Sequence, residues 1–277
     1  MKLQILSDLH LESETFDPEP AADAELLVLA GDIDTRWTAL DRFRGWPVPV
    51  LMVAGNHEFD GRDLRQAWPA LREACERAGI RLLQREAVTI QGRDGRRVRF
   101  VGATRWSDYD LFGEKARPKA MRAASHHLRR ANASIDGQLF DAARMREEGL
   151  ACRLALEDLL TSAHGGADGG AEATVVITHF APSIRSADPR FGRQPGTAGF
   201  CNADDDLLPR ADLWIHGHLH CRHDYLVPRA GHAPTRVVCQ ARGLAAKGEP
   251  QGFDPMKTVE VSAAPPSPPN TLAHRTH

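Results

Sequence analysis

Three observations on the sequence predict an α/β protein with mixed β-sheets. Short apolar runs rich in Val, Leu and Ile recur along the 277 residues, with lengths typical of strands buried on both faces. Segments with helical periodicity separate several of these runs, as in layered α/β folds. One pair of adjoining runs encloses Asp94-Gly95, a hairpin signal that adds an antiparallel pair of strands.

The expected elements follow one another in a clear order. Five apolar runs each lead into polar residues: KLQIL at 2–6, ELLVLA at 25–30, VPVLMVA at 48–54, TVVIT at 174–178 and ADLWI at 211–215. Residues 62–78 have helical periodicity and are followed by Gly79 at a C-cap position. Pro69 inside this segment predicts a kink or a division into two shorter helices.

The domain organisation expected from the sequence is a single domain over residues 1–262. It contains a helical insert at about 107–163, because residues 118–163 are mostly compatible with a helix. The glycine-rich residues 164–173 are expected to form a flexible connection, since a strand follows directly. The tail at 263–277 is rich in proline and poor in apolar residues, so we expect it to be disordered.

The composition is that of an ordinary globular protein, with 42% hydrophobic and 26% charged residues. A formal net charge of −2 argues against strong charge-driven binding to nucleic acid or to an anionic membrane. No apolar run approaches the roughly 18 residues that would span a bilayer, and the first run is too short for the core of a signal peptide. The five cysteines form no CxxC pair, so we expect free thiols and a cytoplasmic location.

Polar clusters stand at the C-terminal end of each of these five strands, where α/β sheets place ligands and catalytic groups. The clusters are Asp8 with His10, Asp32, Asn56 with His57, His179, and His216 to His220. They offer carboxylate, amide and imidazole donors without sulfur, a set that suits Mn, Fe, Zn or Co. Residues two apart in an extended chain point the same way, so Asp8 and His10 are expected to face one ion, and His218 and His220 to share a face of the strand end. Gly217 would allow a close backbone approach.

The ordered series DLH, GD, GNHE, TH and GHLH resembles the signature of the calcineurin-like metallophosphoesterases. The stretches GATRWSDYDLFG, THFAPS and DLWIHGHLH are most similar to bacterial metallophosphoesterases of uncharacterised substrate. The resemblance runs from Asp8 to His220, and the flanking strands extend it over almost the whole chain except the tail. It implies two mixed β-sheets packed face to face as a sandwich, with helices outside in a four-layer α/β/β/α arrangement.

The resemblance also implies a centre of two divalent or trivalent metal ions. One ion would be held by Asp8, His10, Asp32 and His220. The other would be held by Asp32, Asn56, His179 and His218, so that the Asp32 carboxylate bridges the pair. A hydroxide bridging the metals would attack phosphorus, and His57 would donate the proton to the leaving oxygen. The implied activity is hydrolysis of phosphate monoesters or diesters on a small phosphorylated substrate.

Further residues near these motifs have weaker assignments. Asn56, Arg105 and Arg222 are predicted to contact the substrate, with surface salt bridges as the alternative for the two arginines. His216 is expected to support its neighbours or to pack in the core, and Glu58 to be structural. Cys221 is expected to be a bystander, because an adjacent strand residue points the other way.

Two other functions compete with this interpretation. The first is a metal-dependent nuclease or nucleotide phosphodiesterase. The slightly acidic balance and the lack of interleaved basic and aromatic residues argue against stable nucleic-acid binding. The second is a non-catalytic scaffold with the same fold, which would be expected to lose ligands or His57. This chain retains all of them.

Overall fold

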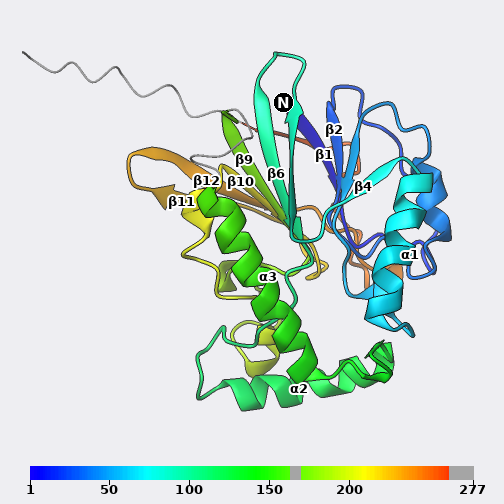
Figure 1. The fold of residues 1–277 in the computed structure, drawn as a ribbon, viewed down its shortest axis with the longest axis vertical. Helices are drawn as coiled ribbons and strands as arrows, with labels where there is room; N and C mark the ends of the chain where they lie inside the picture. Colours follow the sequence, from blue (N-terminus) through cyan, green and yellow to red (C-terminus); the bar gives the residue numbers. More distant parts are fainter. Residues whose placement is uncertain (163–169, 262–277) are drawn as a thin grey trace, which may run out of the picture.

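The computed structural model describes residues 1–162 and 170–261, and it contains two mixed sheets that face each other (Figure 1). The proline-rich tail and most of the glycine-rich connection lie outside the described residues. The first sheet has the order β13-β1-β2-β3-β4, with β13 antiparallel at one edge and the other strands parallel. Its strands are β1 (Lys2–Leu6), β2 (Leu26–Leu29), β3 (Val50–Met52), β4 (Ile80–Leu82) and β13 (Thr258–Glu260).

The second sheet has the order β11-β12-β10-β9-β6-β5. Its four inner strands are parallel, and the edge strands β5 and β11 are antiparallel to their neighbours. The strands are β5 (Glu86–Gln91), β6 (Arg97–Ala103), β9 (Ala173–Thr178), β10 (Leu213–His216), β11 (His223–Arg229) and β12 (His232–Cys239). The hairpin predicted around Asp94-Gly95 is confirmed as β5 and β6.

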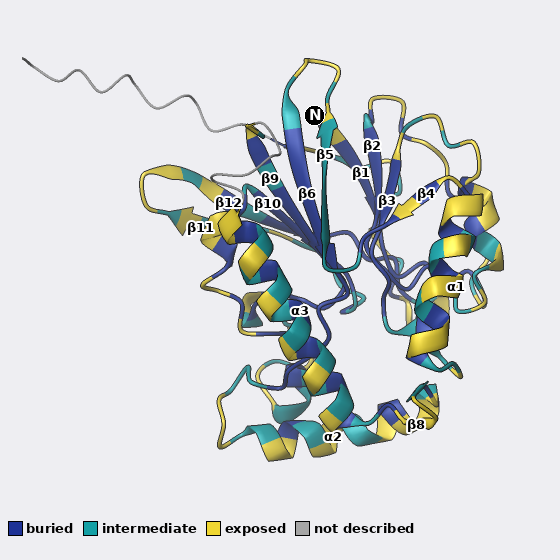
Figure 2. Cartoon of the chain, viewed as in Figure 1, coloured by how far each residue is buried: buried dark blue, intermediate teal, exposed yellow. Residues whose placement is uncertain are grey.

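The apolar core fills the space between the sheets because the inner strands are buried on both faces. Ile5 and Val28 of the first sheet pack in one cluster with Phe100, Ile177 and Ile215 of the second. Figure 2 shows these strands as almost uniformly buried.

Helices cover the two outer faces of the sandwich (Figure 1). Leu71 and Cys75 of α1 (Leu64–Arg77) belong to the cluster that contains Leu29 and Met52 of the first sheet. On the other side, α3 (Ala142–Ser162) packs against β6. The four-layer arrangement of helices and mixed sheets is therefore confirmed.

The helix α1 runs without interruption through Pro69, so the predicted division into two helices is wrong. Asp63 caps its start, with its side chain accepting from the backbone of Arg65 at 3.0 Å. Proline removes one helical hydrogen bond, but the buried face formed by Leu71 and Cys75 holds the helix against the sheet.

The segment at 107–163 contributes two helices and a small hairpin between them. These are α2 (Arg117–Ala131), β7 (Ser134–Ile135), β8 (Gln138–Leu139) and then α3. Short 3₁₀ helices lie in the loops: η1 (Thr38–Phe43), η2 (His57–Phe59), η3 (Ile184–Ser186), η4 (Pro195–Gly199), η5 (Leu208–Arg210) and η6 (Ala245–Lys247). α2 packs on η4, which ties this segment to the loop after β9. Within the described ranges, no helix has the length and apolarity needed to cross a membrane.

Candidate metal centre

Five strands from both sheets end at one edge of the sandwich, and the loops that follow them carry all of the predicted ligands. Parallel strands present their carboxyl ends at the same edge, which is why residues far apart in sequence meet there. The residues are Asp8 and His10 after β1, Asp32 after β2, Asn56 and His57 after β3, His179 after β9, and His218 and His220 after β10.

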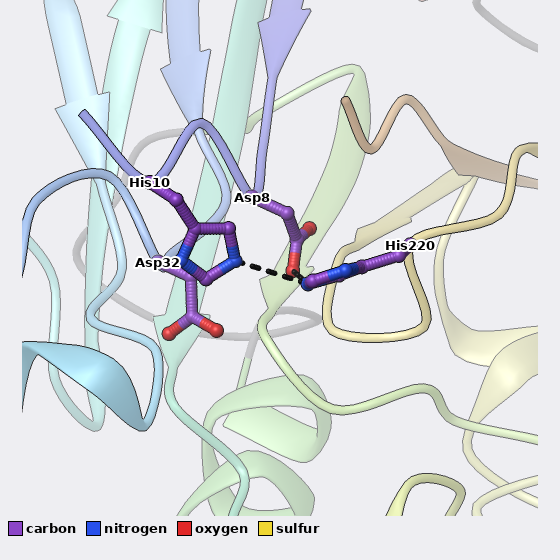
Figure 3. Close-up of side chains that lie close together, drawn as sticks. All are labelled: Asp8, His10, Asp32 and His220. Carbon is purple, nitrogen blue, oxygen red and sulfur yellow. Dashed lines mark hydrogen bonds and ion pairs between the residues drawn. The ribbon is translucent and has the colours of Figure 1, made fainter. Parts of the chain in front are cut away.

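The predicted ligands come together as two groups, each close enough to hold a metal ion. Asp8, His10, Asp32 and His220 each offer one ligand atom, all within 4.8 Å of one another (Figure 3). Asp32, His179 and His218 form a second such group. In the part of the chain that the structure describes, Asp32 is the one residue common to both.

Asn56 is the remaining predicted ligand, and it lies beside the second group. Its Oδ1 is 3.2 Å from Nε2 of His179. The amide oxygen can therefore reach the same ion as the imidazole.

The oxygen and nitrogen atoms of this cluster that could bind a metal are arranged as a bound metal ion would require. Among the described residues, Asp32 Oδ2 is buried and has no hydrogen-bond partner, although it lies 3.2 Å from His179 Nε2. Nε2 of His10 and Nε2 of His220 face each other at 3.0 Å. Buried polar atoms are normally satisfied, and converging carboxylate and imidazole lone pairs are what a divalent cation binds. The residues present thus suit the metal centre that the sequence predicts.

The backbone is left-handed at most of the positions predicted to bind metal. Asp8, His10, Asp32, His218 and His220 have φ values of 53°, 48°, 54°, 71° and 50°. The expected extended conformation of the two pairs is therefore wrong, because the chain turns sharply at each donor. Asp8 and His10 nevertheless lie in one ligand group, as expected, whereas His218 and His220 lie in different groups. Such conformations cost of order 1 kcal/mol or more for residues other than glycine, and they cluster at functional sites.

Two glycines allow these loops to approach one another. A Cβ atom on Gly217 would overlap Ser7 Oγ and would lie 2.7 Å from Asp8 Oδ2. A Cβ atom on Gly55 would overlap Asp32 Oδ1. The close approach predicted for Gly217 is confirmed, and any larger residue at either position would displace a metal-binding carboxylate.

Three of the ligand histidines have Nδ1 directed at an acceptor, which leaves Nε2 for a metal. His179 Nδ1 lies 2.8 Å from the carbonyl oxygen of Ala30. His10 Nδ1 is 3.3 Å from a carboxylate oxygen of Glu12, and His220 Nδ1 is 2.7 Å from Glu249 Oε2.

The fourth ligand histidine is held by packing. The ring of His218 lies against Phe180 and Phe200, with centroid distances of 4.2 and 4.8 Å. Its backbone N–H donates to Asp8 at 3.0 Å, which joins the loop after β10 to the loop after β1.

His57 lies at the rim of the centre, with 41% of its side chain exposed. Its Nδ1 is 2.6 Å from Asp60 Oδ2, and its ring centroid is 5.2 Å from that of His10. Burial lowers the pKa of His57, but the negative charge of Asp32 and the hydrogen bond to Asp60 outweigh it and raise the pKa to about 10. The protein's own charges thus favour a protonated imidazole at this position.

Glu58 joins the two loops that carry Asp32 and Asn56. Its carboxylate accepts from the backbone N–H groups of Asp32 at 3.0 Å, Ile33 at 2.7 Å and Gly55 at 2.6 Å. Burial and then the charge of Asp32 raise the pKa of Glu58 to about 7. The residue is fully buried and positions backbone rather than substrate, which agrees with the structural role predicted for it.

His216 and Cys221 stand next to the ligands without belonging to either metal-binding group of the described chain. His216 is buried, with Nε2 2.9 Å from Ser186 Oγ, and burial lowers its pKa to about 3. It is a neutral core residue that supports the end of β10. Cys221 Sγ lies 3.2 Å from His223 Nε2, away from both groups.

The model of the calcineurin-like phosphoesterase family matches residues 1–222, which is well over half of the chain. The chain belongs to the calcineurin-like phosphoesterase family. This family is metal-dependent and hydrolyses phosphate esters, in agreement with the two groups of aspartate and histidine ligands.

Comparison with solved structures supports the fold of this calcineurin-like phosphoesterase. A phosphopantetheinyl hydrolase from Mycobacterium tuberculosis is 19% identical, with a TM-score of 0.65 over 91% of this chain and 92% of that one. The calcineurin-like phosphoesterase YfkN from Bacillus subtilis is 13% identical, with a TM-score of 0.44 over 86% of this chain and 80% of that one. No curated protein matches the sequence. At 19% identity, the likeness to the phosphopantetheinyl hydrolase shows a shared fold only.

The prediction that Arg105 contacts substrate needs correction. Its side chain is fully buried, and all five N–H donors are used inside this calcineurin-like phosphoesterase. The guanidinium pairs with Asp204 at 2.8 Å and with Asp108 at 2.7 Å. Arg105 therefore anchors the loop that precedes β10.

Arg222 is also engaged with the protein, which argues against the predicted substrate contact. Its Nη1 donates to the carbonyl oxygens of Ala241 and Glu249, both at 3.1 Å, and its Nη2 donates to that of Gln251. The side chain thus holds the segment after β12 against the loop that carries His220.

The residues that contact the predicted ligands without having been predicted from the sequence include Glu12, Phe200 and Glu249. Glu12 could have been found, because it follows His10 by two residues. Phe200 and Glu249 carry no local signal, since each reaches its histidine from a distant part of the chain.

Proposed function

We propose that this calcineurin-like phosphoesterase is a two-metal hydrolase of small phosphate monoesters or diesters. The observation that carries the proposal is Asp32, which belongs to both ligand groups and keeps a buried oxygen without a hydrogen-bond partner among the described residues. A carboxylate shared in this way is suited to bridging two ions.

The surrounding residues support this chemistry from fixed positions. When bound, two cations supply positive charge to the phosphoryl oxygens and lower the pKa of water. The backbone N–H of His57 donates to Asp32 Oδ1 at 2.8 Å, and Oδ2, which has no hydrogen-bond partner among the described residues, would be the oxygen left to bind the ions. Asp60 orients the His57 ring, whose Nε2 would give a proton to the leaving oxygen. Asn56 would hold one ion and contact the phosphoryl group.

The donor set and the charge of the chain support the finer parts of the proposal. Imidazole, carboxylate and amide donors suit Mn, Fe, Zn or Co, and no cysteine belongs to either group found in the described chain. The net charge of −2 favours a small phosphorylated substrate over nucleic acid or a membrane surface. Five free cysteines support a cytoplasmic location.

The test is hydrolysis of bis-p-nitrophenyl phosphate and p-nitrophenyl phosphate by protein stripped of metal and reloaded with Mn²⁺, Fe²⁺, Zn²⁺ or Co²⁺ in turn. We expect activity with at least one metal and little without added metal. The ratio between the two substrates separates a diesterase from a monoesterase. No hydrolysis of either compound with any metal would overturn the proposal.

A nuclease is distinguished by the same protein acting on single-stranded DNA. Activity that falls steeply with added salt indicates phosphate-backbone binding and favours a nuclease. We expect small esters to be hydrolysed with a weak dependence on salt.

A further inference from the structure

Residues 242–251, which we call the strap, lie beyond the region matched by the family model and yet run along the metal centre. The strap is tied to the loop after β1 by backbone hydrogen bonds, from Arg242 to Ser7 and from Gly243 to Asp8, each at 3.0 Å. Glu14 in that loop also accepts from Ala245 N at 3.1 Å and from Arg242 Nη1 at 2.8 Å. The strap is therefore fixed beside Asp8 and His10.

The strap delivers one buried carboxylate, Glu249, to a metal-binding histidine. Glu249 Oε2 lies 2.7 Å from His220 Nδ1 and accepts from Leu244 N at 2.9 Å. Only 5% of its side chain is exposed. Its other oxygen is 3.7 Å from Nη2 of Arg190, a longer contact than the one to His220.

A hydrogen bond from Arg222 and close packing with Gly243 also fix the position of Glu249. Arg222 holds the Glu249 backbone through its carbonyl oxygen at 3.1 Å. A Cβ atom on Gly243 would lie 2.7 Å from Glu249 Cβ and 3.1 Å from His220 Cβ, so strap and ligand are in close contact. Glu249 is thus held against His220 before any metal binds.

We propose that Glu249 is a positioning residue that sets the affinity of one metal site, the group of Asp8, His10, Asp32 and His220, and leaves the other site unaffected. The proposal rests on the two-metal function above. A carboxylate on the far nitrogen of a ligand histidine fixes its tautomer and strengthens its lone pair. In the second group, His179 is oriented by the carbonyl oxygen of Ala30, which a change at Glu249 does not touch.

The experiment is calorimetric titration of Mn²⁺ into metal-stripped wild-type, Glu249→Gln and Glu249→Ala proteins. We expect wild type to bind two ions and Glu249→Ala to lose about 10- to 100-fold in affinity for one of them only. Glu249→Gln should lose less, because its amide oxygen can still accept from His220 and Leu244. Electron paramagnetic resonance is recorded with one equivalent of Mn²⁺ beyond the amount that fills the stronger site. The spectrum should show a magnetically coupled pair of ions in wild type and an isolated ion in Glu249→Ala.

Glu14→Gln is the matched control. The substitution removes a negative charge that contacts the strap, but the Glu14 side chain touches none of the predicted ligand side chains. A glutamine at this position can still accept a hydrogen bond from the backbone of Ala245. We expect nearly wild-type affinity at both sites. If Glu249→Ala and Glu249→Gln each bound two ions with wild-type affinities, the role of Glu249 would be overturned, but the two-metal function would stand. Equal losses in Glu14→Gln and Glu249→Gln would also overturn it, because charge near the site would then explain the effect. Wild-type protein that binds no Mn²⁺ would overturn the two-metal function itself.

Discussion

The two halves of the metal centre are supported in different ways. The first-sheet half consists of Asp8, His10, Asp32, Asn56 and His57, in the loops after β1, β2 and β3. Its orienting carboxylates stand close by in sequence, as Glu12 does after His10, Glu58 after Asn56 and Asp60 after His57. The second-sheet half consists of His179, His218 and His220, in the loops after β9 and β10.

The second-sheet half depends on partners from elsewhere in the chain. Ala30 comes from the opposite sheet, Phe200 from the long loop after β9, and Glu249 from the strap. The residues that orient the first-sheet half therefore lie in the same short motifs as the side chains they orient. The residues that orient the second-sheet half are far away in sequence, and only the fold brings them to the site.

The largest effect is expected at Asp32, which joins the two halves. Asp32→Ala removes the carboxylate common to both groups, so hydrolysis should fall by about 10⁴-fold or more and both ions should be lost. Metal analysis after gel filtration, together with the p-nitrophenyl ester assay, measures both quantities. Two ions retained by Asp32→Ala would show that the halves bind metal independently and that no bridge exists.

His57 belongs to the first-sheet half, and the proposed function gives it the role of proton donor rather than metal ligand. We expect His57→Asn to lower kcat by about 10²–10⁴-fold, as for loss of a general acid, while both ions remain bound. Steady-state kinetics and metal analysis on the same preparation separate the two effects. An equal fall in metal content and rate would place His57 among the ligands instead.

A substitution of Arg105 tests how far a buried ion pair distant from the ligands stabilises the loop that precedes β10 in the second-sheet half. Arg105→Ala leaves Asp108 and Asp204 buried without this partner, and we expect it to lower the free energy of unfolding by about 3–5 kcal/mol. Urea denaturation measures the loss. The folded fraction should keep its KM, because the side chain does not reach the surface. A raised KM with unchanged stability would restore the role in substrate binding.

Glu58 gives the corresponding test of local support in the first-sheet half. Glu58→Ala leaves three buried N–H groups without their acceptor, which should cost about 2–4 kcal/mol after relief of repulsion with Asp32. Glu58→Gln keeps one acceptor oxygen and should lose less. Urea denaturation of both variants checks the order. Equal stability of Glu58→Ala and wild type would mean that water replaces the carboxylate and that local support is weak.

Sequence patterns predicted the strands that lead into the site, because buried parallel strands are continuous apolar runs. They did not predict the three-residue β4 or the edge strands β11 and β13, since short or half-exposed strands have weak patterns. The left-handed backbone at Asp8 and His220 was missed because neighbouring loops, and not local preference, impose it.

Arg105 and Glu249 show why the rest of the site could not be predicted. A residue at a strand end can turn toward the substrate or into the core, and the choice for Arg105 depends on Asp204, from a loop far along the chain. The pairing of Glu249 with His220 depends equally on the path of the strap. Sequence motifs predicted which aspartates and histidines come together in two groups, whereas tertiary packing decides which charged residues support them.

The smallest effect is expected at Phe200, which supports the second-sheet half by packing on the imidazole of His218. Its ring lies nearly parallel to His218, at 25°, but 37% of the residue is exposed, and Phe180 covers another side of the imidazole. Phe200→Ala should therefore lower the free energy of unfolding by only about 1 kcal/mol. It should also weaken the ion bound by His179 and His218 a few-fold, because His218 gains freedom to turn away.

Phe191→Ala on the same loop is the matched control for Phe200, since Phe191 is 63% exposed and no ligand histidine is among its ring partners in the described chain. We expect its stability to stay within about 0.5 kcal/mol of wild type and its metal affinity to be unchanged. Thermal unfolding and Mn²⁺ titration of the two variants measure the difference. If the two variants behaved identically, His218 would need no aromatic support. The dependence of the second-sheet half on distant residues would then be carried by the hydrogen bonds of Ala30 and Glu249 alone.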